Sequence, residues 1–500
     1  MVTKLTMKNE VAEPNEKLPP KDDSSIIIAN LFGEGDWKKE EINWKLRFER
    51  GVSRYPLPLQ TAYLTEKDTL AQIYRKEQGD RIELGTYVGS GGVSCFADMS
   101  TLIGKHTAIL GSTGSGKSAT TASILHSILK PDTKPENWSP QIIILDPHGE
   151  YKKAFSDAVV LSTDNSKLCL PYWLLNFQET VDLLIGKTER VATSQATIIK
   201  EALIELRQKY LPNANVDSPV PYKLSELRSK IEESKPPQES KQASHNSILN
   251  KIDLLTRDAR LNFLMNDHKE ETNVEAVFSP ILQLRKSPVV VDLSGVPDEV
   301  AGICSAAIAR TLFNSKVWQI PEEREKSPIL LVCEEAHRYV PNRGDAQYEA
   351  AQEAIQRIAK EGRKYGIGLF LVSQRPSEID QTVLSQCNSW IVLRLTNEED
   401  RSKVASILPD SLSGLTKMLS GLRNREAIFA GLASDIPARI RIRDLDEKQV
   451  PASNDIDFIK GWSEGTLSDG ELQKIIERWQ QQSMTPQETN PEENNDNNNN

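Results

Sequence analysis

The sequence lacks several features that mark specialised classes of protein. Its five cysteines are scattered and never spaced as pairs, which argues against a disulfide-stapled secreted fold. Its apolar runs, such as 329–333, are far shorter than the roughly 20 residues that a bilayer requires. It has no basic surplus, because 61 Lys and Arg face 71 Asp and Glu, a net charge of −10. A generally basic nucleic-acid coat protein is therefore excluded, although a local basic channel would still suffice to bind nucleic acid.

The start of the chain also lacks a recognisable targeting signal. The first 25 residues are polar and contain no apolar core of a secretory signal. Together with the unpaired cysteines, this predicts a reducing, cytoplasmic location. What is present is ordinary for a globular protein of 500 residues with two to four structural units, since 38% of residues are apolar and 26% are charged.

Short, continuously apolar segments alternate with helical patterns over much of the chain. The strand-like segments lie at 107–110, 141–146, 288–293, 329–334, 367–373 and 390–395. Helical patterns lie between them, for instance at 118–129, 301–318 and 348–360. Continuous apolar strands are typical of parallel sheets that are covered on both faces. The alternation therefore predicts an α/β fold with a mainly parallel sheet, formed by residues 101–172 and 286–450.

A stretch without strand signals, residues 173–285, interrupts this alternation. Apolar residues recur there at helical spacing, as in Ile199, Leu203 and Leu206. Asn176 with Glu179 three residues later is typical of a helix start. We interpret the stretch as an inserted helical subdomain whose apolar stripes form its own core.

The flanking segments are expected to differ from the α/β core. Residues 25–100 favour a small, barrel-like β-rich domain, and residues 451–483 a C-terminal helix that begins at the Ser468–Glu471 pair. Residues 1–24 and the Asn-rich tail 484–500 are too polar to bury a core, so we expect them to be disordered.

The strongest motif is Gly-Ser-Thr-Gly-Ser-Gly-Lys-Ser at 111–118, which matches G-x-x-x-x-G-K-[ST] between a predicted strand and a predicted helix. Glycines let the main chain wrap a phosphate, and the helix start adds a positive field. Lys117 is expected to contact the β- and γ-phosphates of ATP, and Ser118 to bind Mg²⁺. The predicted nucleotide-binding residues are Gly111, Ser112, Thr113, Gly114, Ser115, Gly116, Lys117, Ser118 and Ala119. The alternative, a Gly/Ser-rich linker, rarely lies between a buried strand and a helix.

A second motif is the pair Glu334-Glu335 at the end of the apolar segment 329–333. Two carboxylates at a buried strand end are costly unless a cation or a reaction uses them. We assign Glu334 to the Mg²⁺ shell, through water, and Glu335 to polarising the attacking water. The alternative is a pair of exposed acids. His148 and His337 have no Cys or His partner at ligand spacing, which predicts ordinary polar contacts.

Two further candidates surround the segment 367–373. Gln374, directly after it, is placed to orient water or to sense the γ-phosphate; the alternative is a simple turn residue. Arg363, before it, is a candidate arginine finger for a neighbour's nucleotide, with Arg357 as the second candidate. For Arg363, a solvated cation at a helix end is an equally good interpretation.

Together these blocks resemble the HerA/FtsK branch of P-loop ATPases, most of all the HerA-type bacterial and archaeal DNA translocases. The motifs that carry the resemblance span about 85–445 and are 106–118, Asp146-Pro-His-Gly-Glu150, Leu170-Pro-Tyr-Trp173, Val291-Asp-Leu-Ser294, Glu334-Glu-Ala-His337, Glu361-Gly-Arg-Lys364 and Ser373-Gln-Arg-Pro376. The chain departs from the pattern at Glu334, where many relatives have Asp, and its first 80 residues match the family barrel poorly.

The resemblance implies a RecA-like core and a homohexameric ring with ATP at subunit interfaces. It also implies double-stranded DNA in a central pore and a small N-terminal β-barrel. Relatives commonly act with a nuclease or another effector, in DNA-end processing or in defence against phage.

Two functions remain open at this stage. The first is a DNA-dependent ATPase that moves along duplex DNA, which it would contact through Lys and Arg on pore loops. The second is a nucleotide-gated hexameric scaffold that assembles and regulates an effector enzyme. A small-molecule kinase is disfavoured because no acceptor-binding motif is visible.

Overall fold

The computed structural model of the chain describes residues 2–7, 25–29, 31, 33–40, 43–57, 61, 63, 65–74, 80–131, 135, 137–164, 167–186, 193–266, 274–282, 288–342, 349–409, 412–452, 458–465 and 467–481. It consists of two compact units. The first comprises Met1–Ile142, Phe313–Arg343 and Ala354–Pro451, and the second comprises Ile143–Leu312, Gly344–Glu353 and Ala452–Asn500.

The first unit contains a mixed sheet of strands that are distant in sequence. Its strands, from one edge, are β6 (Ser94–Asp98), β5 (Arg81–Tyr87), β15 (Ala438–Ile442), β14 (Glu426–Gly431), β13 (Ser389–Val392), β7 (Thr107–Leu110), β12 (Ile367–Ser373) and β11 (Ile329–Cys333). The last four run parallel to one another, and the others pair antiparallel. The parallel strands are buried almost throughout, as their continuous apolar sequences predict.

The register of the parallel strands brings their carboxyl ends to one edge of the sheet. Leu110 of β7 lies opposite Ser373 of β12 and Val392 of β13. Residues 111, 374 and 393 therefore leave the sheet side by side. This edge is where the loops of a parallel sheet usually bind ligands.

The antiparallel half of this sheet differs from the sequence-based domain boundaries. Strands β5 and β6 fall within the predicted N-terminal domain 25–100, but β5 pairs with β15 and so extends the main sheet. Strands β14 and β15 also carry no clear signal in the sequence. Pairing across several hundred residues decides their place, and local periodicity does not report such pairing.

The N-terminal region forms two separate two-stranded antiparallel sheets. β1 (Val2–Met7) pairs with β2 (Ser25–Ala29), and β3 (Gly33–Glu40) pairs with β4 (Asn43–Arg50). The prediction that residues 1–24 are disordered is therefore wrong for 2–7, whereas 8–24 lie outside the described residues. The described residues before β5 show these hairpins and a short helix rather than a closed barrel.

Helices α2 (Met99–Gly104) and α3 (Lys117–Leu129) pack against strands of this sheet, whereas α1 (Lys67–Tyr74) packs against β4. The other α-helices of the first unit are α11 (Pro321–Lys326), α12 (Glu349–Tyr365), α13 (Gln381–Ser385), α14 (Glu398–Ile407) and α15 (Ser413–Thr416), where α12 begins in the second unit. Helix α12 continues five residues beyond the predicted end at Lys360, so that Arg363 lies in its last turn.

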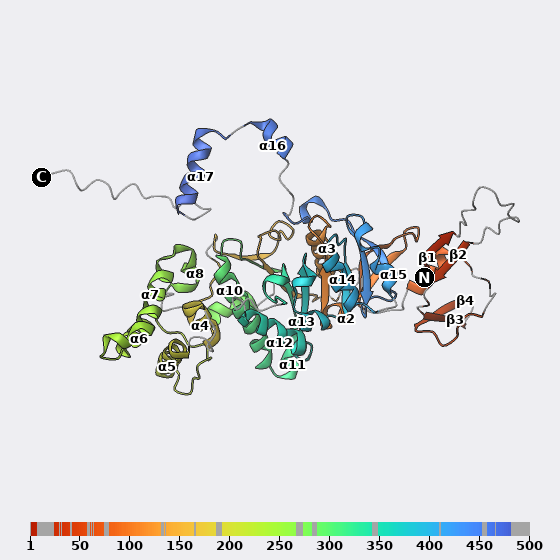
Figure 1. Cartoon of the computed structure of the whole chain (residues 1–500). Helices are drawn as coiled ribbons and strands as arrows, with labels where there is room; N and C mark the ends of the chain where they lie inside the picture. Colours follow the sequence, from red (N-terminus) through yellow and green to blue (C-terminus); the bar gives the residue numbers. More distant parts are fainter. Residues whose placement is uncertain are drawn as a thin grey trace, which may run out of the picture. The chain divides into compact units, whose positions relative to one another are not determined.

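The second unit combines a parallel sheet with the predicted helical insertion. β8 (Gln141–Asp146) pairs with β10 (Val289–Asp292), and β10 pairs with β9 (Val159–Ser162). The helices, olive to green in Figure 1, are α4 (Phe177–Ile185), α5 (Thr193–Tyr210), α6 (Leu224–Glu233), α7 (Ala243–Arg257), α8 (Asn262–Met265), α9 (Val274–Leu282) and α10 (Asp298–Val317), which ends in the first unit. The apolar stripes of α5, α6 and α7 are buried against one another, as the sequence predicts.

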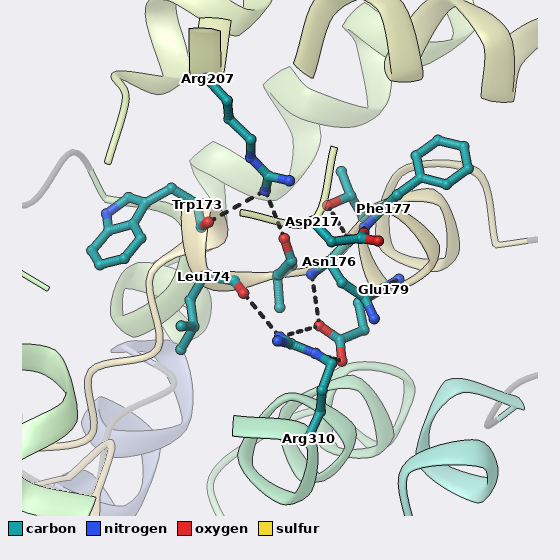
Figure 2. A network of polar contacts seen from close by, with 10 residues as sticks. Trp173, Leu174, Asn176, Phe177, Glu179, Arg207, Asp217 and Arg310 are labelled. Atoms are coloured by element: carbon teal, nitrogen blue, oxygen red, sulfur yellow. Dashed lines mark hydrogen bonds and ion pairs between the residues drawn. The ribbon is translucent and has the colours of Figure 1, made fainter. Parts of the chain in front are cut away.

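An ion-pair network fixes the chain where it enters the insertion (Figure 2). Arg310 on α10 donates to both carboxylate oxygens of Glu179, at 2.7 and 2.8 Å, and to the carbonyl oxygen of Leu174, at 2.9 Å. Glu179 also accepts the main-chain N–H of Asn176, which completes the predicted capping box of α4. Fully buried Arg207 donates to the carbonyl oxygen of Leu175 at 2.8 Å.

The C-terminal segment forms two helices instead of the single predicted one, α16 (Phe458–Glu464) and α17 (Asp469–Gln481). Glu471 accepts the main-chain N–H of Ser468 at 2.8 Å, in keeping with the predicted helix start. The apolar side chains of α17 remain exposed, with Trp479 at 75%. The tail 484–500 lies outside the described residues.

Candidate nucleotide-binding site

The loop between β7 and α3 has the conformation that a phosphate-binding loop requires. Gly114 and Gly116 adopt φ values of 71° and 90°, a region that glycine occupies without strain. A Cβ on Gly116 would lie 2.7 Å from Oδ1 of Asn424. Gly116 is also the N-cap of α3 and makes no side-chain cap. The first N–H groups of the helix therefore have no intrahelical acceptor, an arrangement that suits a phosphate.

Lys117, the first residue of α3, is buried beside Glu335. Its Nζ lies 2.9 Å from Oε1 of Glu335, and both side chains are only 9% exposed. The structure thus brings together two residues that lie more than two hundred positions apart in the sequence. Lys117, predicted to bind the phosphates, and Glu335, predicted to polarise the water, therefore neutralise each other's charge.

Glu335 has an unusual backbone. It follows β11 with Glu334 in between and adopts a φ of 49°, in the left-handed region that non-glycine residues rarely enter. Its Oε2 is buried and makes no hydrogen bond within the described part of the chain, although Nδ1 of His337 lies 3.2 Å away. Backbone strain and an unsatisfied buried oxygen both occur at functional sites more often than elsewhere.

His337 connects Glu335 to the end of β12. Its Nδ1 lies 3.1 Å from Oγ of Ser373, the last residue of that strand. Burial lowers the pKa of His337, and the nearby carboxylate of Glu335 opposes this shift. The imidazole is therefore neutral at neutral pH and has one N–H to donate.

Glu334 and Ser118 are the candidates for holding Mg²⁺. Glu334 is 4% exposed, and its Oε2 accepts the main-chain N–H of Glu335 at 3.3 Å. Among the described residues, no three His, Cys, Asp or Glu side chains form a cluster that would hold a metal by themselves. A hydroxyl and a carboxylate nevertheless fit Mg²⁺, which keeps several waters and takes further oxygens from a triphosphate.

Gln374 contacts the phosphate loop directly. Its Oε1 accepts a hydrogen bond from Oγ1 of Thr113 at 2.6 Å. A cleft of about 530 Å³ opens here and is lined by Ser112, Thr113, Gln374, Arg375, Ser377, Glu378, Asn397, Glu399 and Asp400. The predicted position of Gln374, beside the loop at the sheet edge, is therefore the observed one.

Comparison with known proteins shows which family the chain resembles. A sequence profile of the central domain of helicase HerA matches residues 82–312. The DNA double-strand break repair helicase HerA of Pyrococcus furiosus is 25% identical over 501 residues, which cover 88% of this chain and 85% of that protein. A probable helicase of Methanocaldococcus jannaschii is 24% identical over 458 residues, 91% of this chain and 83% of that protein. Over most of its length the chain is therefore similar to HerA helicases, and residues 82–312 match their central domain.

Two solved structures share the fold of this chain. VirB4 of Thermoanaerobacter pseudethanolicus superposes with a TM-score of 0.55 at 18% identity, covering 75% of this chain and 99% of that one. The bacterial conjugative coupling protein TrwB gives 0.52 at 14% identity, covering 80% and 97%. Within the described residues, no helix has the length and apolarity needed to cross a bilayer.

The arginine-finger candidates of this chain lie away from its own phosphate loop. Arg363 is exposed, and its charge contributes to lowering the pKa of His106, the residue that precedes β7. The phosphate loop follows the other end of the same strand. Arg357 is stacked over the ring of Phe313, 4.5 Å from its centroid. The structure therefore brings neither arginine to the phosphate loop of the same chain.

Sequence reasoning missed three residues that flank the phosphate loop. Arg394 donates to the carbonyl oxygen of Gly114 at 3.4 Å, and the main-chain N–H of Arg425 donates to that of Ser115 at 3.2 Å. Asn424 lies against Gly116. Arg425 has a φ of 61°, so strain again occurs beside the loop. No motif marks these residues, because only the pairing of β13 and β14 brings them here.

Proposed function

We propose that the chain hydrolyses ATP to move along double-stranded DNA as a ring of identical subunits, a homohexamer. The observation that carries this proposal is the buried contact between Lys117 and Glu335, with Gln374 bonded to the same loop. Support for DNA as the track comes from relatives named as DNA double-strand break repair helicases. Support for a nucleotide comes from TrwB, a structural neighbour that has been solved with a non-hydrolysable ATP analogue.

Each residue of the site has a distinct part in the proposed reaction. The amides at the start of α3 and the ammonium of Lys117 hold the phosphates, and Ser118 and Glu334 hold Mg²⁺. Mg²⁺, when bound, neutralises charge that develops on the phosphate oxygens. Glu335 accepts a proton from the attacking water, and Gln374 orients that water against the γ-phosphate.

The proposed ring explains the positions of the arginines. Arg363 cannot serve the phosphate loop at the opposite end of β7 in its own chain without a large rearrangement. An adjacent subunit would let it reach a neighbour's γ-phosphate, where an arginine accelerates phosphoryl transfer by roughly 10³-fold or more. A nuclease or other effector as partner, with a role in DNA-end processing or in phage defence, is the finer part of this proposal.

The test is the ATPase rate with and without duplex DNA at two salt concentrations. We expect DNA to stimulate the rate strongly and the stimulation to fade with salt, because phosphate contacts release counterions. The Lys117→Ala variant provides the background rate. A rate that ignores DNA but responds to a copurifying protein would contradict the motor and support the scaffold.

A further inference from the structure

The carboxylate of Glu335 has one satisfied and one unsatisfied oxygen. Oε1 receives Nζ of Lys117 at 2.9 Å. Oε2 is buried without a hydrogen bond in the described part of the chain, and Nδ1 of His337 is 3.2 Å away. A buried oxygen beside a ring nitrogen that bonds elsewhere indicates a contact that can form when the surroundings change.

Nδ1 of His337 faces the neighbouring strand. It lies 3.1 Å from Oγ of Ser373, and this hydroxyl oxygen accepts the main-chain N–H of Arg375 at 3.0 Å. The imidazole therefore lies between two elements of the site. One is the carboxylate of Glu335, and the other is the end of β12, where Gln374 reaches Thr113.

Lys117 cannot serve Glu335 and a triphosphate equally. A triphosphate carries several negative charges, so it draws the ammonium away from a single carboxylate. Glu335 would then be left buried with neither oxygen paired, and an unpaired buried charge is strongly unfavourable. A neutral donor that is already within reach would hold the carboxylate and still leave it able to accept a proton.

We propose that His337 is a positioning residue that takes over the carboxylate of Glu335 when Lys117 turns to the phosphates. In this proposal the imidazole carries its proton on Nδ1, and this N–H turns from Ser373 to Oε2 of Glu335, which leaves Oε1 free for the attacking water. The release of Ser373 also couples this step to the strand end that carries Gln374. This inference rests on the roles proposed above for Lys117 and Glu335.

The experiment compares three substitutions at one position in the full-length protein. His337→Ala removes the donor, and we expect kcat to fall roughly 10- to 100-fold with KM for ATP nearly unchanged. His337→Asn places an amide N–H close to the position of Nδ1, so it should recover most of kcat. His337→Gln places its amide further out, near the position of Nε2, and should recover little.

Two results would overturn the proposal. One is a kcat for His337→Ala that equals that of the unmodified protein. The other is equal kcat in the Asn and Gln variants, a comparison that stays informative even if the Ala variant fails to fold. Measuring Glu335→Gln in parallel distinguishes a failure of the proposed function from a failure of the role proposed for His337. If Glu335→Gln keeps parental turnover, the proposed function fails; if it is inactive while His337→Ala is fully active, only the role of His337 fails.

Discussion

Two buried ion pairs of the chain are built in opposite ways. In the nucleotide-binding site, Lys117 contacts one oxygen of Glu335, and the other oxygen has no hydrogen bond in the described structure. In the helical insertion, Arg310 contacts both oxygens of Glu179, which also caps α4 (Figure 2). The pair for which we propose an exchange of partners keeps unused bonding capacity, whereas the pair in the insertion is saturated.

Backbone strain follows the same division. The described non-glycine residues with left-handed φ are His106, Glu335 and Arg425, and all three lie in the first unit. Glu335 contacts Lys117, and Arg425 bonds to the phosphate loop. Each such residue costs of the order of 1–3 kcal/mol and persists only where its surroundings hold it. The insertion, in contrast, begins with an unstrained capping box.

The largest expected effect is the loss of turnover in Lys117→Ala. We expect ATP turnover to fall roughly 10³-fold or more, the scale on which a cation at the transferred phosphate acts. The melting temperature should also fall, because the substitution leaves the buried carboxylate of Glu335 without its cation. Calorimetric titration with ATP and thermal unfolding measure the two effects. If Lys117→Ala bound ATP as tightly as the unmodified protein, the assignment of the nucleotide-binding site would be wrong.

Glu179→Gln should lower stability but, unlike Lys117→Ala, leave turnover intact. It leaves the guanidinium of Arg310, which is 15% exposed, without its charged partner. Breaking a buried pair in this way destabilises by roughly 3–5 kcal/mol. Urea unfolding measures the loss, and ATPase activity per folded molecule should stay near that of the parent. The control is Glu201→Gln on the exposed face of α5, which should change stability by well under ~1 kcal/mol. A Glu179→Gln protein as stable as this control would contradict the comparison.

His106 differs from Glu335 because its backbone is strained but its buried Nδ1 has a hydrogen-bond partner. Burial lowers its pKa to about 4 from the ordinary 6.5, and its Nδ1 accepts the main-chain N–H of Leu369 at 3.1 Å. The unfolded chain takes up a proton near pH 6.5 and the folded chain only near pH 4. The free energy of unfolding therefore falls as pH drops through this window, by roughly 3 kcal/mol in total.

His106→Asn removes this contribution and keeps a side chain that tolerates left-handed φ and can accept the N–H of Leu369. Urea midpoints at pH 7, 5.5 and 4.5 should therefore fall less steeply in the variant than in the parent. Equal slopes would show that His106 does not titrate as its burial implies.

The sequence predicts the parallel core and the phosphate loop well, because both depend on local patterns. The predicted segments 107–110, 141–146 and 367–373 coincide with β7, β8 and β12. The capping box at Asn176 is also local and is found as predicted. What periodicity cannot reveal is long-range pairing, which places β5 beside β15 and Arg425 beside Ser115.

The fine geometry of the site is similarly invisible in the sequence. The motif predicts Lys117 and Glu335 as site residues, but not that they bind each other. Nor does it predict the approach of His337, since the 3.2 Å contact depends on the left-handed turn at Glu335. A turn of that kind is held by the surrounding tertiary structure rather than by local preference.

The most direct test of the central claim is Glu335→Gln, measured for ATP binding and for turnover in the same preparation. Because the amide keeps the shape of the carboxylate but cannot take a proton, the account predicts ATP affinity within a few-fold of the parent. Turnover should fall by roughly 10²- to 10⁴-fold. Turnover equal to that of the parent would show that another group activates the water.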